Sequence, residues 1–524
     1  MPEHPTPAGV PHGVTVAVGV GPVSLADVVA VARDGAPVRL TDEARAAIEQ
    51  ARAVVDGLAA APTPAYGIST GFGALATRHI PTGMRAQLQR SLVRSHAAGS
   101  GQPVEREVVR GLMLLRLSTL ATGRTGVRPE LAELMAAVLN AGITPVVHEY
   151  GSLGCSGDLA PLAHCALALI GEGEVHDADG VLMPAARALE SAGLSPIELV
   201  AKEGLALING TDGMLGMLVM ALTDLSVLMR TADIAAAMSV EGQLGTDRVF
   251  APELQAIRPH PGQAASAANL AAILKDSGVV ASHRGPDCHR VQDAYSLRCS
   301  PQVHGAARDT LDHCATVAGR ELASAIDNPV VMEDRVESNG NFHGAPVAYV
   351  LDFAAIVAAD VASISERRTD RFLDRSRSHG LPPFLAHDPG VDSGHMIAQY
   401  TQAAIVSELK RLANPASVDS IPSSAMQEDH VSMGWSAART LRRSVDGLTR
   451  VIAVEVLTAA RALDLRRPLE PSPATGAVVD LLRSNGVQGP GPDRHLSPEI
   501  ETCVHLVRDG RVLAAVEAVI GELR

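Results

Sequence analysis

Four stretches of the 524-residue sequence repeat apolar side chains at the period of an α-helix over long distances. In the longest, apolar residues recur at intervals of three and four from Met214 to about Val240. Val347–Arg367, Val445–Leu465 and the shorter Glu105–Leu120 repeat the pattern. Because the apolar stripes are broad, each helix is expected to pack on more than one side. The pattern predicts a mainly α fold: a long central helix bundle with smaller flanking helical and loop regions.

Composition agrees with a large aliphatic core. Hydrophobic residues make up 46% of the chain and aromatic residues only 2%, so Ala, Val, Leu, Ile and Met fill the interior. Charged residues make up 19%, below the roughly 25% of an average soluble domain. These figures exclude a disordered chain, a small disulfide scaffold and a β-rich architecture.

Charge and cysteine usage narrow the choice of partners and compartment. The net charge is −14 and lysine occurs only at Lys202, Lys275 and Lys410, so we expect no nucleic-acid partner. The N-terminal residues lack the pattern of a signal peptide. Apolar runs such as Met214–Thr223 are interrupted by charge, so we expect no membrane span. Six cysteines without a CxxC pair indicate reduced thiols and a cytoplasmic location.

Several familiar motifs are incomplete. Gly71–Ala76 imitates a dinucleotide-binding loop without a preceding apolar strand, which leaves a nicotinamide-dependent oxidoreductase as a different-class alternative. Gly154–Gly157 is one residue short of a G-x-S-x-G nucleophile turn. His148-Glu149 is not followed by the second histidine of a zinc site, so we expect no metal. A helical scaffold without catalysis is a third possibility.

One segment carries a more specific signal. Tyr150-Gly-Ser-Leu-Gly-Cys155-Ser156-Gly157-Asp158-Leu-Ala-Pro-Leu-Ala-His164 resembles the signature of the aromatic amino-acid ammonia-lyase family. Six further motifs resemble that family in the same order, and they begin at Tyr66, Arg94, Lys202, Gln292, Ser338 and Met426. The resemblance covers nearly the whole chain and implies a helix bundle of the ammonia-lyase/fumarase-like type. It also divides the chain into an N-terminal region, 1–208, with the signature loop, and a long-helix and C-terminal helical region, 209–524.

In that family a triad of a small residue, serine and glycine cyclises autocatalytically into 4-methylidene-imidazol-5-one, an electrophile that replaces any external cofactor. The resemblance assigns this triad to Cys155-Ser156-Gly157, with Cys155 where the family commonly has alanine. The glycine nitrogen has to attack the preceding carbonyl within a tight loop, where a side chain would obstruct it. The serine hydroxyl leaves as water. Asp158 either assists this cyclisation or only caps the following helix.

The resemblance also assigns catalytic and head-group roles. Tyr66 is expected to remove the β-proton of the substrate, although it could be a core tyrosine. Arg298 is expected to bind the substrate carboxylate with two donors, or else to form a structural ion pair. Asn209 is expected to bind the substrate head group or the electrophile, with a loop-bracing amide as the alternative. Tyr295 and Gln292 are expected to orient the electrophile.

The remaining site residues point to the substrate side chain. Ser95-His96 and Gln427-Glu428-Asp429-His430 are similar to the branch of the family that acts on histidine. His96 and Glu428 are therefore expected to recognise an imidazole ring, and Phe342 to wall the pocket, unless these three residues only pack around it.

This resemblance implies a carbon–nitrogen lyase that converts L-histidine into ammonia and trans-urocanate, the first step of histidine degradation. Lyases or aminomutases acting on tyrosine or phenylalanine remain the alternative within the family. The resemblance further implies a homotetramer whose active sites are shared between subunits.

Overall fold

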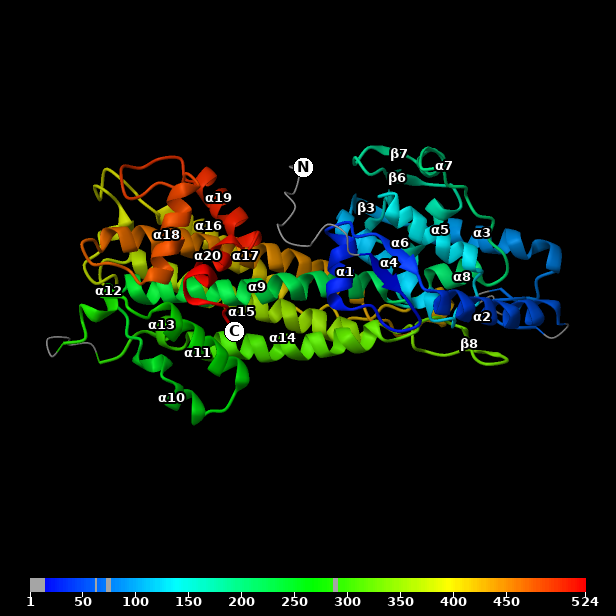
Figure 1. Cartoon of the computed structure of the whole chain (residues 1–524), viewed down its shortest axis with the longest axis horizontal. Helices are drawn as coiled ribbons and strands as arrows, with labels where there is room; N and C mark the ends of the chain where they lie inside the picture. The colour runs from blue at the N-terminus through cyan, green and yellow to red at the C-terminus, as the bar shows by residue number, and fades with distance from the viewer. Residues whose placement is uncertain (1–14, 62–63, 72–76, 286–290) are drawn as a thin grey trace. The chain divides into compact units, whose positions relative to one another are not determined.

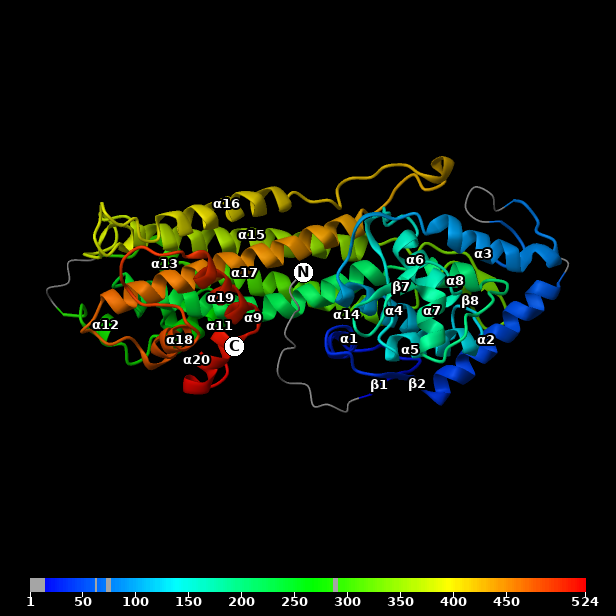
Figure 2. The ribbon, with the colours of Figure 1, turned by 90° about the horizontal axis from the view of Figure 1, so that it is seen from above.

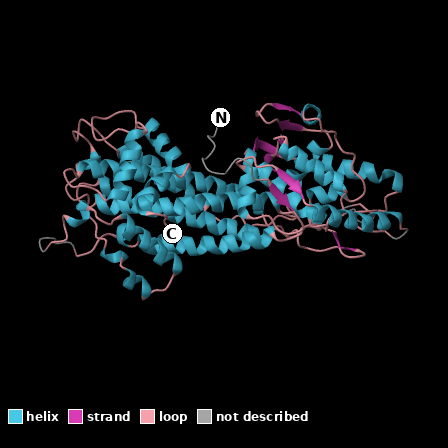
Figure 3. Ribbon diagram, viewed as in Figure 1, coloured by secondary structure: helices cyan, strands magenta, loops and turns pink. Residues whose placement is uncertain are grey.

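The computed structural model describes residues 15–61, 64–71, 77–285 and 291–524. Helices make up most of these residues and the strands are two to four residues long (Figures 1 and 3). The prediction of a mainly α fold is confirmed.

Within the described ranges, four helices exceed twenty residues: α9 (Asp212–Gly242), α14 (Ser300–Leu322), α15 (Ala345–Leu373) and α17 (Gly434–Leu465). The periodicity located both ends of α9 and the start of α15 within two residues, but it ended α15 at Arg367 instead of Leu373. It placed the start of α17 too late, at Val445. The helix begins at Gly434, next to Trp435, whose indole nitrogen donates to the carbonyl of Glu149 at 2.8 Å. The periodicity did not predict α14, whose sequence alternates apolar residues with many polar ones.

The chain forms two compact units, each assembled from separate stretches of sequence. Unit 1 contains residues 1–220, 315–352 and 415–439; unit 2 contains 221–314, 353–414 and 440–524. The four long helices contribute residues to both units. The domain boundary expected after residue 208 stays a prediction, since these units are discontinuous in sequence.

Unit 1 combines short helices with small sheets. Its helices are α1 (Leu25–Ala32), α2 (Asp42–Ala60), α3 (Arg85–His96), α4 (Arg106–Ala121), α5 (Pro129–Asn140), α6 (Leu159–Leu169), α7 (Ala185–Ser191) and α8 (Glu203–Ile208). Strands β1 (Val16–Val18) and β2 (Val38–Leu40) pair in parallel. The other strands pair antiparallel: β3 (Ser100–Pro103) with β5 (His148–Tyr150), β4 (Thr144–Pro145) with β6 (Glu174–His176), β6 also with β7 (Leu182–Pro184), and β8 (Val330–Val331) with β9 (Val336–Glu337).

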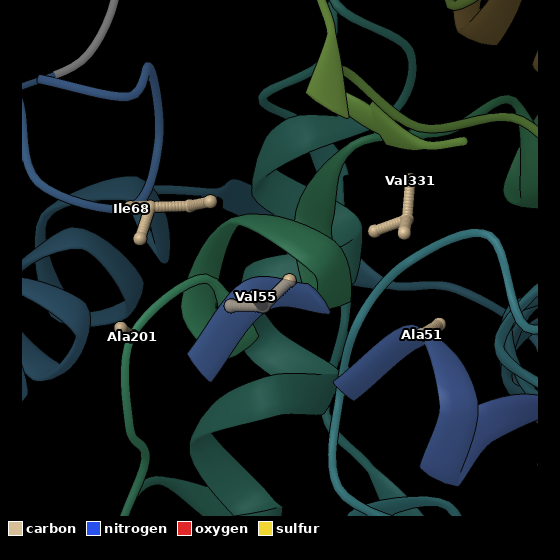
Figure 4. Packing of buried hydrophobic residues seen from close by; sticks show 5 residues of the cluster. All are labelled: Ala51, Val55, Ile68, Ala201 and Val331. Carbon is tan, nitrogen blue, oxygen red and sulfur yellow. The ribbon is translucent and has the colours of Figure 1, made fainter. Parts of the chain in front are cut away.

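A small apolar cluster in unit 1 joins segments that are far apart in sequence. Ala51 and Val55 of α2 pack with Ile68, Ala201 and Val331, and all five are at least 92% buried (Figure 4). Burial of such side chains is worth about 25 cal/mol per Å² of apolar surface. The cluster thereby holds three loops in place: those that contain Tyr66, Lys202 and Asp327.

Unit 2 is built on the long helices and covered by shorter ones: α10 (Pro252–Ala256), α11 (Pro261–Ile273), α12 (Gly278–Ala281), α13 (Tyr295–Arg298), α16 (Met396–Leu412), α18 (Pro473–Ser484), α19 (Ser497–Arg508) and α20 (Arg511–Ile520). Helices α9, α15 and α17 run side by side (Figures 1 and 2). Between these helices the fully buried Glu455 of α17 accepts hydrogen bonds from Ser239 of α9 and Ser365 of α15, both at 2.6 Å. Arg368 of α15 forms an ion pair with the same carboxylate at 2.5 Å.

By length and composition alone, α9 and α15 are apolar enough to cross a membrane, with mean hydropathies of 1.5 and 1.9 over 18 residues. We expected charge to interrupt the apolar run after Thr223, but α9 is still apolar enough over 18 residues to pass this test. Of these two windows, 78% and 67% are buried inside the structure, as in core helices of soluble proteins.

Candidate functional site

The triad Cys155-Ser156-Gly157 forms a tight turn immediately before α6. Gly154 and Gly157 have φ angles of 67° and 76°, in the left-handed region that side chains disfavour. A Cβ atom on Gly157 would collide with the carbonyl of Gly210. The backbone here needs glycine both for its conformation and for its close approach to the neighbouring loop.

This turn is joined to the residues that precede α9. Gly157 and Gly210 form an isolated parallel bridge, and the amide of Asp158 donates to the carbonyl of Gly210 at 2.7 Å. The hydroxyl of Ser156 donates to Oδ1 of Asn209 at 2.6 Å. Two loops 53 residues apart thus place the serine hydroxyl against the carboxamide of Asn209.

The side chain of Asp158 holds the triad turn in place. Its buried carboxylate accepts hydrogen bonds from the hydroxyl of Ser152 at 2.9 Å and from the amide of Met214 at 2.8 Å. The second bond serves the first turn of α9, which begins at Asp212, slightly before the Met214 that the periodicity indicated. Burial raises the pKa of Asp158 to about 7, although the hydrogen bonds from Met214 and Ser152 act in the opposite direction.

Glu428 lies beside the first residue of the triad. Its Oε2 accepts a hydrogen bond from the hydroxyl of Ser423 at 2.6 Å, and its carboxylate is hydrogen-bonded to the thiol of Cys155. Burial, and secondarily the charge of Glu428, raise the pKa of Cys155 to about 12. The thiol is therefore protonated at neutral pH and acts as a donor to the carboxylate.

His96, at the end of α3, has a defined tautomer. Its Nδ1 lies 2.9 Å from the carbonyl oxygen of Leu92, which can only accept, so Nδ1 carries the proton. Burial lowers the pKa of His96, while Leu92 and the charge of Glu428 act in the opposite direction. The ring is therefore neutral at pH 7, and its Nε2 is an acceptor.

The segment that carries Glu428 is fixed to the signature loop. The amide of Met433 donates to the carbonyl of Leu153 at 2.9 Å, and the hydroxyl of Ser432 donates to that of Gly154 at 3.2 Å. Just before Glu428, Ser424, Ala425 and Met426 all have left-handed φ angles, of 49°, 52° and 70°. Such conformations persist only where the surroundings enforce them, and they cluster at functional sites.

Tyr66 and Phe342 are both half-buried in unit 1. Tyr66 opens a turn in which the amide of Ser69 donates to the carbonyl of Ala65 at 2.9 Å. Gly67 approaches Leu205 so closely that an added Cβ would lie 2.9 Å from its side chain. The predicted site residues of unit 1 are thus Tyr66, His96, the triad, Asn209, Phe342 and Glu428.

The other three predicted site residues belong to unit 2. Gln292 and Tyr295 are exposed, Tyr295 by 73% of its surface. Arg298 donates from Nε to the carbonyl of Asp293 at 2.8 Å, and its guanidinium lies 4.7 Å from the centre of the Tyr295 ring. Within a single unit, these residues are not brought together with the triad.

Three residues that support the unit 1 site had no role assigned to them from the sequence. Ser423 holds Glu428, and the buried ion pair Lys202–Asp327 lies behind Asn209. Lysine scarcity was a signal for Lys202, whereas nothing in the sequence singled out Asp327. Among the described residues, no group of three or more His, Cys, Asp and Glu side chains is arranged to hold a metal ion.

The imitated dinucleotide loop, Gly71–Ala76, lies outside the described residues except for Gly71. The described element that precedes it is helix α2, whereas a dinucleotide fingerprint follows a strand.

Comparisons with known proteins match nearly the whole chain to one family. Residues 23–484 match the aromatic amino acid lyase family. A histidine ammonia-lyase of Streptomyces coelicolor is 68% identical over 511 residues, which cover 97% of this chain and all of the relative. A histidine ammonia-lyase of Gloeobacter violaceus is 50% identical over 95% of this chain and 96% of its own length.

Solved structures share the fold. A histidine ammonia-lyase from Trypanosoma cruzi superposes with a TM-score of 0.88 at 38% identity, covering 96% of this chain and 95% of its own. A tyrosine aminomutase from Streptomyces globisporus gives a TM-score of 0.92 at 38% identity, covering 98% and 100%.

Proposed function

The chain belongs to the aromatic amino acid lyase family, and from this premise we propose that it eliminates ammonia from L-histidine to give trans-urocanate. The relatives at 66–68% identity are all histidine ammonia-lyases. The observation that carries the proposal is the grouping in unit 1: the triad turn contacts Asn209 on one side and Glu428 on the other. The charge of Glu428 in turn acts on His96.

Cys155-Ser156-Gly157 is proposed to become 4-methylidene-imidazol-5-one, the only cofactor required. The turn suits this group, because Gly157 leaves the backbone unobstructed and Asn209 accepts the hydrogen of the hydroxyl that has to leave. When formed, the group supplies an electron-poor carbon that captures the substrate amine and makes nitrogen a better leaving group. Its place before the N-terminus of α6 favours an electron-poor ring.

Recognition of the imidazole is assigned to His96 and Glu428. The neutral His96 offers Nε2 as an acceptor and Glu428 offers a carboxylate oxygen, so both select a ring that donates N–H groups. A phenyl ring has no hydrogen-bond donor and a phenol ring has one O–H, whereas a protonated imidazole has two N–H donors to match the two acceptors. This pairing favours histidine over phenylalanine and tyrosine, and Phe342 is proposed to wall the ring.

Proton transfer and head-group binding are assigned to the remaining residues. Tyr66 is proposed to take the β-proton, and Asn209 to bind the head group. Arg298 is proposed to bind the substrate carboxylate, with Tyr295 and Gln292 orienting the electrophile. Because these three belong to unit 2 and two of them are exposed, we propose that they complete the active site of another subunit in a homotetramer.

The proposed location is the cytoplasm. The five described cysteines form no disulfide bond, which fits a reducing compartment.

Two measurements test the proposed function. Purified protein incubated with L-histidine, L-tyrosine and L-phenylalanine in turn should form urocanate, detected by its ultraviolet absorbance, and little cinnamate or coumarate. Intact-mass measurement should find the chain lighter than its sequence by two waters, and Ser156→Ala should remove this deficit together with the activity. Turnover of tyrosine or phenylalanine in preference to histidine would contradict the proposal, as would a full sequence mass in active enzyme.

A further inference from the structure

Lys202 and Asp327 form a fully buried ion pair next to Asn209 of the candidate site. Lys202 Nζ lies 2.5 Å from Asp327 Oδ2, and both side chains have no exposed surface. Lys202 is one of three lysines in the chain. An isolated buried charge is strongly unfavourable, so each partner requires the other.

The pair reaches the site through Asn209. The Nδ2 group of Asn209 donates to the carbonyl of Asn328 at 3.0 Å and lies 3.4 Å from Asp327 Oδ1, while its Oδ1 accepts from Ser156. The two ends of a carboxamide have nearly the same shape, so only their hydrogen-bond partners fix its orientation. If the amide were reversed, its oxygen would face the carboxylate of Asp327 and its NH₂ group would face Ser156.

The same carboxylate organises the loop that carries Phe342. Asp327 Oδ1 accepts from the amide of Asn328 at 2.7 Å. The side chain of Asn328 then accepts from the Ser338 hydroxyl at 3.1 Å and from the Asn339 amide at 3.0 Å. The side chain of Asn339 donates back to the carbonyl of Asp327 at 3.0 Å.

Packing holds both partners in place. Lys202 adopts a left-handed conformation, φ 77°, directly before α8, a conformation that a non-glycine residue keeps only when its surroundings enforce it. Its neighbour Ala201 and the nearby Val331 belong to the apolar cluster that also contains Ile68 (Figure 4). Two separate segments of the chain thus hold the Lys202 ammonium and the Asp327 carboxylate at fixed positions.

We propose that Lys202 and Asp327 are positioning residues that hold the Asn209 carboxamide with its oxygen toward Ser156, and that they thereby support formation and use of the electrophile. The inference rests on the proposed function, because Asn209 faces the residue from which the electrophile would form. Lys202 holds the buried carboxylate of Asp327 in place, and the Oδ1 atom of that carboxylate selects the NH₂ end of Asn209.

The test uses the full-length chain and compares variants of this pair with a matched control. Lys202→Met removes the cation, and the double variant Lys202→Met/Asp327→Asn removes both charges of the pair, so it is expected to fold even if the single variant does not. Arg110→Met is the control: Arg110 is also a buried cation of unit 1, but it bonds only the carbonyls of Val31 and Leu139.

In both pair variants, a smaller share of chains should show the deficit of two waters by intact mass. Among the matured chains, kcat should fall by about tenfold, with a smaller change in KM. An effect of this size is typical when residues that orient a catalytic group are lost. Arg110→Met should lower the melting temperature while its chains mature fully. Complete maturation and unchanged kcat in the folded double variant would overturn the inference. The wild-type mass and urocanate assay report separately on the proposed function.

Discussion

Burial sets the protonation state of the groups around the triad. It lowers the pKa of His96, which therefore stays neutral, and it raises the pKa of Cys155 to about 12, which keeps the thiol protonated. The site thus presents one fixed acceptor, His96 Nε2, and one fixed donor, the Cys155 thiol. The donor is directed at Glu428, whose other partner is the hydroxyl of Ser423.

We predict that Cys155→Ala matures normally but binds L-histidine less well. Loss of one weak hydrogen bond to the Glu428 carboxylate corresponds to about 1 kcal/mol, or roughly a fivefold increase in KM. Cys155→Ser keeps a donor and should restore most of the affinity. Cys165→Ala, which removes a buried thiol from α6, is the control. An unchanged KM in Cys155→Ala, with full maturation by mass, would show that the thiol does not position Glu428.

Sequence motifs identified most residues that face the triad, but not the residues that hold them. Asn209 and Glu428 lie in motifs whose residue types follow from the chemistry. Asp327 is 125 residues from Lys202, and its role arises only when the chain folds. Similarly, the hydroxyl of Ser423 supports Glu428 through a turn of left-handed residues that no local pattern indicated.

The long helices were predictable as elements because their apolar periodicity is strong, whereas their polar contacts were not. Glu455 interrupts the apolar face of α17, yet it is fully buried and joins three helices through Ser239, Ser365 and Arg368. Helix α14 was missed because polar residues recur along it, and some of them are buried: His304 bonds Asp233 at 2.8 Å. Periodicity reports which face is apolar and carries no information about such buried pairs.

At the junction of α16 and α17, a buried histidine makes stability depend on pH. His395 precedes α16, is 2% exposed, and its Nδ1 lies 3.1 Å from Oγ1 of Thr458 in α17. Burial, followed by the charges of Arg461 and Arg494, lowers the pKa of His395 to about 3. An unfolded histidine has a pKa of about 6.5, so below that pH the unfolded chain binds a proton that the folded chain does not.

We therefore predict that His395 destabilises the fold as pH falls from 6.5 towards 3. Its contribution should lower the free energy of unfolding by about 2 kcal/mol between pH 7.5 and pH 5. His395→Gln keeps a polar side chain that does not titrate, so this variant should lose less stability over the same range. The comparison is made from urea midpoints of the two proteins at each pH. Parallel pH curves would mean that His395 is not held neutral.

For the whole molecule, the exposed aromatic residues are the informative feature. The chain has only eleven Phe and Tyr residues and one Trp. Tyr349, Phe353 and Ile356 follow one face of α15 and remain 52%, 42% and 44% exposed, and Tyr295 is 73% exposed. Large apolar side chains grouped on one face favour contact with another protein surface. The proposed homotetramer, in which a second copy of the chain covers these residues, accounts for their exposure.

A shared active site has a consequence that a site within one chain does not have. If Tyr66 comes from one subunit and Tyr295 from another, then Tyr66→Phe and Tyr295→Phe are each nearly inactive as homotetramers. Unfolding and refolding an equal mixture should restore activity, because about a quarter of the sites then receive both native residues by chance. Each variant refolded alone is the control, and wild-type protein carried through the same cycle sets the full value. If both tyrosines served a site within one chain, the mixture would be no more active than its components, since no subunit in it carries both native residues.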